Sequence, residues 1–307
     1  MKRIATVFAV LILILSGVSC LNPSADVILP LDVPAARPSA RPVTAADIPV
    51  PSASGVAIME NEKAVVDYSN VSDGYVMVMY HADTDSELRT LIDSPDGVRY
   101  TYTLNPGSYA VYPLTEGDGE YTIGVYEQTD GIKYKLILKT TADVSVSDPL
   151  APFLSPSQYV NYDINSYVVA TAAEITAGAE SLLDIITAIY NYVVSNIVYD
   201  EELAETVQSG YLPDVDAVLK SKKGICFDYS AVMAAMLRSQ GVPTKLVVGF
   251  NEGEYHAWLN VHSQETGWIN MVVFFDGSAW RLMDPTLAAG EIDYIAIEAD
   301  YEAKYQY

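Results

Sequence analysis

The sequence predicts an α+β protein, in which an all-β, sandwich-like domain is followed by a domain whose helices precede its strands. Two observations support this prediction. Short segments rich in tyrosine and valine, separated by glycine-containing turns, recur between residues 56 and 146. After Asp148-Pro149 the pattern changes to an apolar helical periodicity, and from Lys245 onward it returns to strands.

The predicted strands of the first domain often alternate between apolar and polar residues, as half-buried strands do. They cover residues 64–68, 74–80, 99–104, 107–112, 119–126 and 134–139. Turn signals such as Asn105-Pro106-Gly107 and Asp130-Gly131 separate them, which is typical of a small sandwich. No catalytic pattern occurs here, and we expect His81 to be an ordinary surface histidine rather than a metal ligand.

The second domain begins with helices. Apolar residues at helical spacing predict a core helix over 181–198. We expect a second helix over 214–221, ended by Gly224 in a left-handed cap, and a third from Cys226 to Gln240. Strands are predicted over 245–250, 255–262, 268–275 and 280–283.

The N-terminus has the features of an export signal. Lys2 and Arg3 precede a short apolar run over residues 7–15, and small residues lead to Cys20. This resembles a bacterial lipobox, although Gly17 stands where leucine is usual. We therefore predict a lipoprotein signal peptide over 1–20, lipidated at Cys20, and an extracytoplasmic, membrane-anchored protein; plain secretion is the alternative.

A proline-rich stretch over 21–54 predicts an extended tether between this anchor and the folded part. The predicted boundaries are then 55–147 for the sandwich-like domain and 148–307 for the second domain. The chain carries 40 acidic and 17 basic residues, a formal net charge of −23, so we expect no nucleic-acid partner.

The most informative segment surrounds Cys226, one of only two cysteines in the chain. If Cys20 is lipidated, Cys226 is the single remaining thiol, and no disulfide is possible. The predicted position at a helix start stabilises a thiolate, because unpaired N–H groups and the positive end of the helix dipole lie there. A buried, inert cysteine is the competing interpretation.

Two further residues are candidates for activating this thiol. His256 starts one predicted strand and Asp284 ends another, so adjacent strands can bring the imidazole and the carboxylate together. His262 is a rival base on the same strand face, but it lies about 20 Å further along at ~3.3 Å per residue.

These segments together resemble the bacterial transglutaminase-like superfamily. The resemblance rests on Gly224-Ile225-Cys226-Phe227-Asp228-Tyr229-Ser230, on 237–243, His256-Ala257-Trp258 and Gly267-Trp268, and on Asp284-Pro285-Thr286, in this order. It covers roughly residues 186–286 and implies a papain-like thiol fold.

In such a fold Cys226 would be the nucleophile, His256 the base and Asp284 the residue that orients it. The resemblance also places an aromatic residue, Tyr199, near the thiol, where it either helps at the oxyanion or packs. We expect Trp258 to be a wall that shields the ion pair. No metal and no cofactor are predicted, since no acidic loop has the ligand spacing of a calcium site.

The predicted function is acyl transfer on amide or peptide carbonyls of a protein or peptide, cell-wall peptides included. Transglutamination and hydrolysis use the same triad, so the residues leave these two outcomes open. A non-catalytic surface module that binds a polymer, with a relic thiol fold, is the alternative from another functional class.

Overall fold

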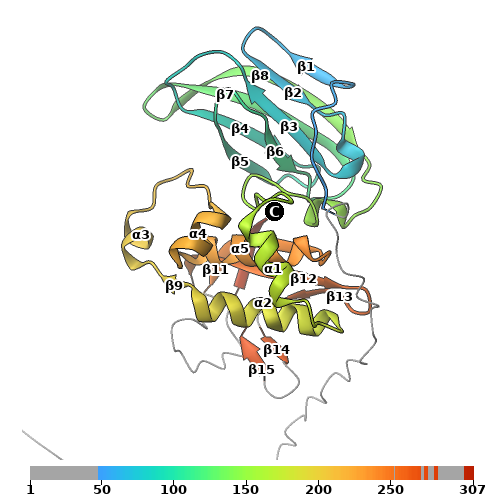
Figure 1. Ribbon diagram of the computed structural model, residues 1–307. Coiled ribbons are helices and arrows are strands. Elements are labelled where there is room, and N and C mark those ends of the chain that lie inside the picture. The colour runs from blue at the N-terminus through green and yellow to red at the C-terminus, as the bar shows by residue number, and fades with distance from the viewer. Residues whose placement is uncertain (1–47, 252, 271–272, 276–279, 283–300) are drawn as a thin grey trace, which may run out of the picture. The chain divides into compact units, whose positions relative to one another are not determined.

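The α+β fold class is confirmed, since a sheet-rich N-terminal region is followed by helices and further strands (Figure 1). The computed structural model describes residues 48–251, 253–270, 273–275, 280–282 and 301–307. All of them belong to one unit, Ala36–Tyr307. Cys20 and Asp284 lie outside the described residues. Within these ranges, no helix combines the length and the apolarity needed to cross a membrane.

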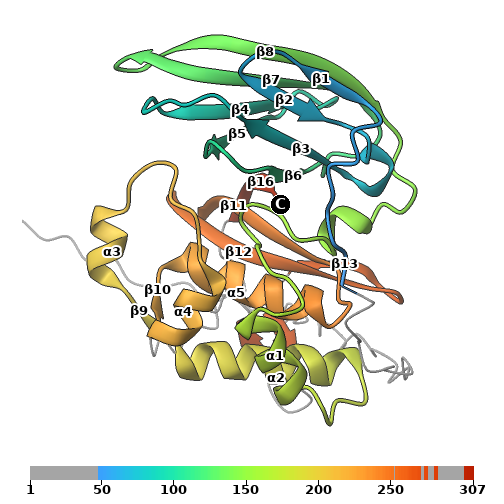
Figure 2. The ribbon, with the colours of Figure 1, turned by 45° about the horizontal axis from the view of Figure 1, so that its top comes forward.

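The N-terminal strands form two antiparallel four-stranded sheets (Figure 2). The order β1-β2-β3-β6 joins Ile58–Glu60, Ala64–Asp67, Tyr75–Tyr80 and Ala110–Pro113. The order β5-β4-β7-β8 joins Arg99–Leu104, Leu88–Asp93, Gly119–Asp130 and Lys133–Val144. Sequence reasoning missed β1 and β4, although β4 alternates buried and half-buried residues as strands do.

Tyrosines account for much of this part of the core. The fully buried ones are Tyr80, Tyr100, Tyr102, Tyr112 and Tyr121. Four of these hydroxyl groups donate hydrogen bonds; Tyr112, for example, donates to the carbonyl of Thr103 at 3.0 Å, and Tyr121 donates to that of Gly117 at 3.0 Å. Tyrosine fills the interior with large rings while its polar end stays hydrogen-bonded.

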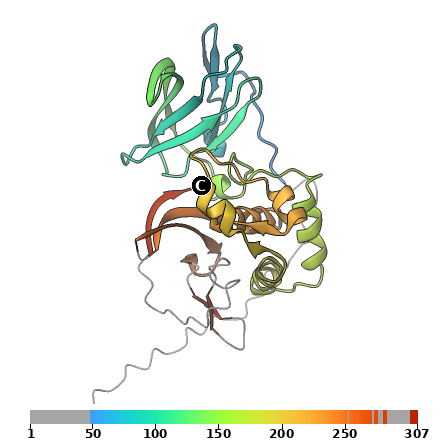
Figure 3. The same cartoon turned by 90° about the vertical axis from the view of Figure 1, so that its left-hand side faces the viewer.

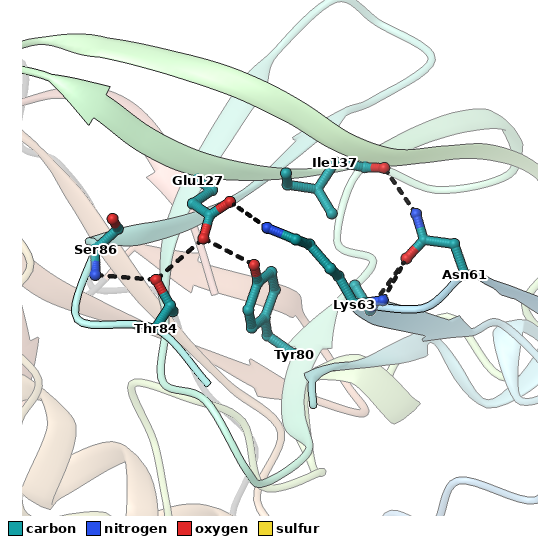
Figure 4. A network of polar contacts seen from close by, with 8 residues as sticks. Asn61, Lys63, Tyr80, Thr84, Ser86, Glu127 and Ile137 are labelled. Carbon is teal, nitrogen blue, oxygen red and sulfur yellow. Dashed lines mark hydrogen bonds and ion pairs between the residues drawn. The ribbon is translucent and has the colours of Figure 1, made fainter. Parts of the chain in front are cut away.

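A polar network ties the two sheets together (Figure 4). Glu127 on β7 accepts hydrogen bonds from Lys63 at 2.8 Å, Tyr80 at 2.9 Å and Thr84 at 3.0 Å. The bond from Lys63 is the main cause that lowers the pKa of Glu127. Because this one carboxylate on β7 accepts from three donors, including Tyr80 on β3, the network links the two sheets.

The second part begins with five helices (Figure 3). They are α1 (Tyr167–Ile175), α2 (Leu182–Asn196), α3 (Glu201–Thr206), α4 (Val215–Ser221) and α5 (Cys226–Ser239). The three predicted helices correspond to α2, α4 and α5, whereas α1 and α3 were not predicted. Every residue of α5 from Asp228 to Ser239 is buried, because the helix packs against α1, α2 and α4 and also against two strands, β11 and β12.

Four strands form the sheet that α5 packs against, in the order β13-β12-β11-β16. They are Gly267–Asn270, Glu254–Ser263, Thr244–Asn251 and Tyr301–Gln306. The prediction of one strand over 268–275 was wrong: β13 pairs with β12, whereas β14 (Val273–Phe275) pairs with β15 (Trp280–Leu282). A change of pairing partner cannot be read from strand propensity.

Gly249 allows β16 to approach β11. A Cβ at this position would overlap the carbonyl oxygen of Glu302 and lie 2.9 Å from the ring of Trp258. The ladder shifts register between Val248 and Gly249, as the backbone of β16 crosses the glycine. The last strand therefore depends on a residue without a side chain.

Residues near the C-terminus also contact the sandwich. Thr115 Oγ1 donates to the carbonyl of Gln306 at 2.8 Å, and Gln306 Nε2 donates to Glu116 at 2.8 Å. The rings of Tyr100 and Tyr307 meet edge to face, with centroids 5.5 Å apart. These contacts join segments about 190 residues apart in the chain.

Arg238, near the end of α5, links several segments of the second part. It is 2% exposed. Its guanidinium donates to the carbonyl of Thr244 at 2.7 and 2.9 Å, to that of Ser155 at 2.9 Å and to that of Tyr307 at 2.6 Å. Burial lowers the pKa of Arg238 to about 10, so the group is still charged at neutral pH.

We expect Arg238→Met to lower the free energy of unfolding by about 3 kcal/mol or more, because buried carbonyl oxygens would lose their donors. Urea unfolding followed by circular dichroism measures the change. Arg99→Met is the matched control: Arg99 forms an exposed ion pair with Asp93, which typically contributes less than about 1 kcal/mol. Similar losses in the two variants would contradict the prediction.

Candidate active site

The chain leading to Cys226 is fixed by a short parallel pairing. Strand β10 (Lys223–Gly224) pairs with β9 (Val198–Tyr199), and Gly224 lies opposite Tyr199. The N–H of Asp200 donates to the carbonyl of Gly224 at 2.9 Å. As predicted, Cys226 is the first residue of α5, where the positive end of the helix dipole favours a thiolate.

The predicted role of Gly224 as a left-handed helix cap was wrong. Helix α4 ends at Lys222, which takes the left-handed conformation itself with φ of 58° and donates its N–H to the carbonyl of Val218 at 2.8 Å. Gly224 serves a different purpose, since a Cβ there would lie 2.6 Å from the Cβ of Asp228. The glycine makes room for the Asp228 side chain beneath the backbone.

Asp228 holds the turn that precedes the thiol. Its carboxylate is fully buried and accepts from the N–H of Ile225 at 2.9 Å and from the hydroxyl of Tyr211 at 2.7 Å. Ile225 has no side-chain acceptor to return, so only half of a reciprocal capping box is present. Burial raises the pKa of Asp228, while these two hydrogen bonds act in the opposite direction.

Two tyrosines lie near the sulfur of Cys226, which is itself half-buried. Tyr199 comes from β9 and is 37% exposed; Tyr255 comes from β12 and is 64% exposed. Burial raises the pKa of both phenols, and the negative charge of a Cys226 thiolate raises it further in each case. Both groups therefore keep their protons at neutral pH, and both lie within electrostatic range of the thiol.

His256 lies on β12, opposite Gly249 on β11. Its ring is nearly parallel to that of Trp258, with ring centroids 6.4 Å apart and an angle of 18° between the planes. The centroid of the Tyr301 ring also lies 6.4 Å from that of the imidazole. Trp258 is 4% exposed, as expected for a wall beside the histidine. The role of Trp258 as a shield stays a prediction.

Side-chain alternation along β12 separates Tyr255 from His256. Ala257, Leu259 and Val261 belong to the core, and Tyr255 shares their parity, whereas His256 shares that of Trp258. The charge of Cys226 is one of the causes that raise the pKa of Tyr255, after burial and the neighbouring Tyr305. His256 is the third residue of the strand.

The rival histidine occupies a different setting. His262 lies six residues along β12, and its ring meets that of Trp268 edge to face at 5.1 Å. Its backbone N–H donates to the carbonyl of Pro243 at 2.9 Å. Asp284, the predicted orienting carboxylate, falls two residues beyond β15 and outside the described residues.

Among the residues that the structure describes, no group of three or more histidine, cysteine or acidic side chains could hold a metal ion. His81 is exposed. A separate surface pocket, whose lining includes Pro49, Asp73 and Asp148, shares no residue with the surroundings of Cys226.

Sequence reasoning missed Asp228, Tyr211 and Tyr255. Asp228 had a usable signal, since an acidic residue at the third position of a helix is the reciprocal half of a capping box. Tyr255 stands next to a candidate histidine, which is also a signal. Tyr211 had none, because its contact with Asp228 spans 17 residues and depends on the path of a loop.

Residues 169–285 match the family model of the transglutaminase-like superfamily. This part of the chain is a transglutaminase-like domain. The match begins within α1 and includes both Cys226 and His256. The resemblance inferred from the sequence is thereby confirmed, while the lipid anchor stays a prediction.

Curated relatives match parts of the chain. The uncharacterized protein YebA of Bacillus subtilis (strain 168) is 25% identical over 187 residues, which is 54% of this chain and 25% of that protein. A protein-glutamine gamma-glutamyltransferase of Pseudomonas aeruginosa is 26% identical over 98 residues, which is 26% of this chain and 14% of that protein. This chain thus spans a quarter or less of either relative.

Among solved structures, a candidate cysteine protease from Cytophaga hutchinsonii is similar over 69% of this chain and 71% of its own, at 14% identity. The TM-score is 0.36, so this likeness supports no conclusion about activity.

The buried Asp228 predicts a pH dependence of stability. Because its folded pKa is raised, the folded protein holds this proton more tightly than the unfolded chain does. Its contribution to stability is complete below the unfolded pKa of about 3.9 and is lost as pH rises through the folded pKa. We therefore expect Asp228→Asn to gain stability relative to the wild type as pH rises from about 4 toward neutrality.

Urea unfolding of both proteins across this range measures the difference. Asp93→Asn is the control of opposite sign, since the hydrogen bond from Arg99 lowers the pKa of Asp93. Its series extends down to about pH 2, because that variant should lose stability relative to the wild type as pH rises toward about 4 and keep a constant difference above it. Parallel slopes for the two variants would refute the assignment.

Proposed function

We propose that this chain is a thiol acyl-transfer enzyme that acts through Cys226. The observation that supports the proposal best is the position of Cys226 at the first residue of α5, beside two protonated tyrosines, within a transglutaminase-like domain. A half-buried sulfur at a helix start has both the electrostatic environment and the access that a nucleophile needs.

In the proposed first stage, the thiolate of Cys226 attacks the carbonyl carbon of a carboxamide. A C–S bond forms, the C–N bond breaks, and the leaving amine takes a proton from the imidazolium of His256. The developing oxyanion accepts from the backbone N–H of Cys226 and from the hydroxyl of Tyr199. Asp284 is proposed to orient His256.

In the second stage, a nucleophile attacks the thioester, releases the thiolate and gives its proton to His256. A primary amine yields a new amide, and water yields a carboxylate. The relative from Pseudomonas aeruginosa, by its name, transfers glutamyl groups of protein glutamine. We propose the same donor class here, a glutamine side chain or a related amide of a protein or peptide.

The proposed location is outside the cytoplasm, with the chain anchored to the membrane through a lipid on Cys20. The residues that would carry this anchor, and the first part of the proline-rich stretch behind them, up to residue 47, lie outside the described residues. Cell-wall peptides would be accessible substrates at that location.

The pH profile of thiol alkylation tests the thiolate–imidazolium pair, in a Cys20→Ser chain whose single cysteine is Cys226. We expect the wild-type thiol to react well below its ordinary pKa of about 8.5, and His256→Ala to move the midpoint back toward that value. His262→Ala is the matched control on the same strand and should leave the profile unchanged.

The alkylation profile is a direct test of whether the imidazole of His256 reaches the sulfur of Cys226. A wild-type midpoint near 8.5, unaffected by His256→Ala, would favour the non-catalytic surface module over the enzyme.

An assay with a glutamine peptide and a fluorescent primary amine tests the transfer itself. Cys226→Ala should abolish both amine incorporation and ammonia release. Tyr199→Phe should lower kcat on the order of 10²-fold, as loss of an oxyanion donor does, with little change in KM. Ammonia release without amine incorporation would assign hydrolysis, and an unchanged kcat in Tyr199→Phe would return that residue to a packing role.

A further inference from the structure

The loop between α3 and α4, residues 207–214, contacts the β-sandwich. Thr103 Oγ1 on β5 donates to the carbonyl of Gly210 at 3.4 Å. A Cβ at Gly210 would lie 2.8 Å from Thr103 Oγ1 and 3.2 Å from Arg89 Nη1. The loop backbone is therefore packed against side chains of two sandwich strands, β4 and β5.

The sandwich side of this contact is well fixed. Arg89 Nη1 donates to Thr103 Oγ1 at 3.0 Å, and its guanidinium also pairs with Glu87. The backbone carbonyl of Thr103 accepts from Gln158 at 2.6 Å and from Tyr112 at 3.0 Å. The Arg89 side chain is only 14% exposed. Arg89 and Thr103 therefore form a well-fixed surface under the loop, which we call the platform.

The next residue of the loop carries the contact to the thiol. Tyr211 donates to the buried carboxylate of Asp228, and Asp228 accepts from the N–H of Ile225, directly before Cys226. Three consecutive polar contacts thus connect the sandwich with the backbone at the nucleophile.

A second connection reaches the residue after the cysteine. The ring of Tyr159 stacks on Tyr102 of the sandwich at 5.6 Å and meets Phe227 edge to face at 5.2 Å. Burial raises the pKa of Tyr159 to about 12; Tyr255 raises it further, and the charge of Arg89 lowers it. Arg89 and Tyr255 therefore lie in the neighbourhood of the same ring.

We propose that the β-sandwich braces Cys226 on both sides, through Thr103–Gly210–Tyr211–Asp228 before it and through Tyr102–Tyr159–Phe227 after it. The sandwich is then part of the machinery that sets the position of the sulfur. Arg89, Thr103, Gly210 and Tyr211 are positioning residues in this arrangement. An effect of the sandwich on catalysis rests on the proposed function, whereas its effect on the rigidity of the backbone around Cys226 does not.

The glycines of the chain provide a matched pair for the test. Gly210 has φ of +89° and Gly97, in a sandwich turn, has φ of +90°, so alanine is equally strained at either position. A Cβ at Gly97 meets nothing within 4 Å, whereas one at Gly210 collides with the platform. Tyr211→Phe is the gentler variant, since it removes a single hydroxyl group.

Hydrogen–deuterium exchange of the peptide over 223–229 in the full Cys20→Ser chain is the first readout. We expect Gly210→Ala and Tyr211→Phe to increase exchange there on the order of tenfold, as loss of a local hydrogen bond allows opening. Gly97→Ala should resemble the wild type. The alkylation rate of Cys226 at fixed pH should fall about tenfold in the first two variants, since a displaced sulfur loses the helix start and the cationic partner that favour the thiolate.

Unchanged exchange and alkylation in both Gly210→Ala and Tyr211→Phe would overturn the brace. If the wild-type thiol proves to be ordinary while the exchange effect is present, the brace stands and the catalytic function fails. If the thiol is activated but insensitive to both variants, the function stands and the brace fails.

Discussion

The buried carboxylate of Asp228 is the interaction on which the site depends. It fixes the N–H of Ile225, receives the hydroxyl of Tyr211, and occupies the space that Gly224 leaves open. A buried carboxylate is costly unless donors satisfy it, so these partners must be present together. The turn before Cys226 is consequently specified by residues from a loop, a short strand and the helix itself.

Local patterns in the sequence were sufficient to find α5 and the cysteine that starts it. The end of α5 after Ser239 and the apolar face of α2 depend on residues that are close in sequence, so both can be predicted from local patterns. Gly224 was misassigned because a glycine after a helix fits a left-handed cap. The space that it leaves for the Asp228 side chain, four residues later, is not visible in that local pattern. Tyr211 and Arg89 act through contacts that depend on the tertiary path of the chain, so periodicity could not reveal them.

The same limit applies to the far end of the chain. β16 joins the sheet through Gly249, and Gln306 bonds to Thr115, although no helical or strand period relates these positions. Arg238 donates to the carbonyl of Tyr307 as well as to those of Thr244 and Ser155, so it holds the end of the chain against two other segments. A sequence can indicate that a strand exists. Which strand it pairs with depends on the folded chain, where buried backbone N–H and carbonyl groups need hydrogen-bond partners.

The position of Asp228 imposes a compromise on the thiol. A carboxylate in the first turn of α5 interacts favourably with the helix dipole, but it also opposes a second negative charge on Cys226 two residues earlier. Hydrogen bonds from Ile225 and Tyr211 spread the charge of the carboxylate, and burial shifts it toward the neutral form. An imidazolium at the thiol would offset what remains, so the geometry that positions the nucleophile also increases its need for a cationic partner. In the proposed site, a rigid turn would supply the position of the thiol and His256 would supply the charge, and neither alone supplies both.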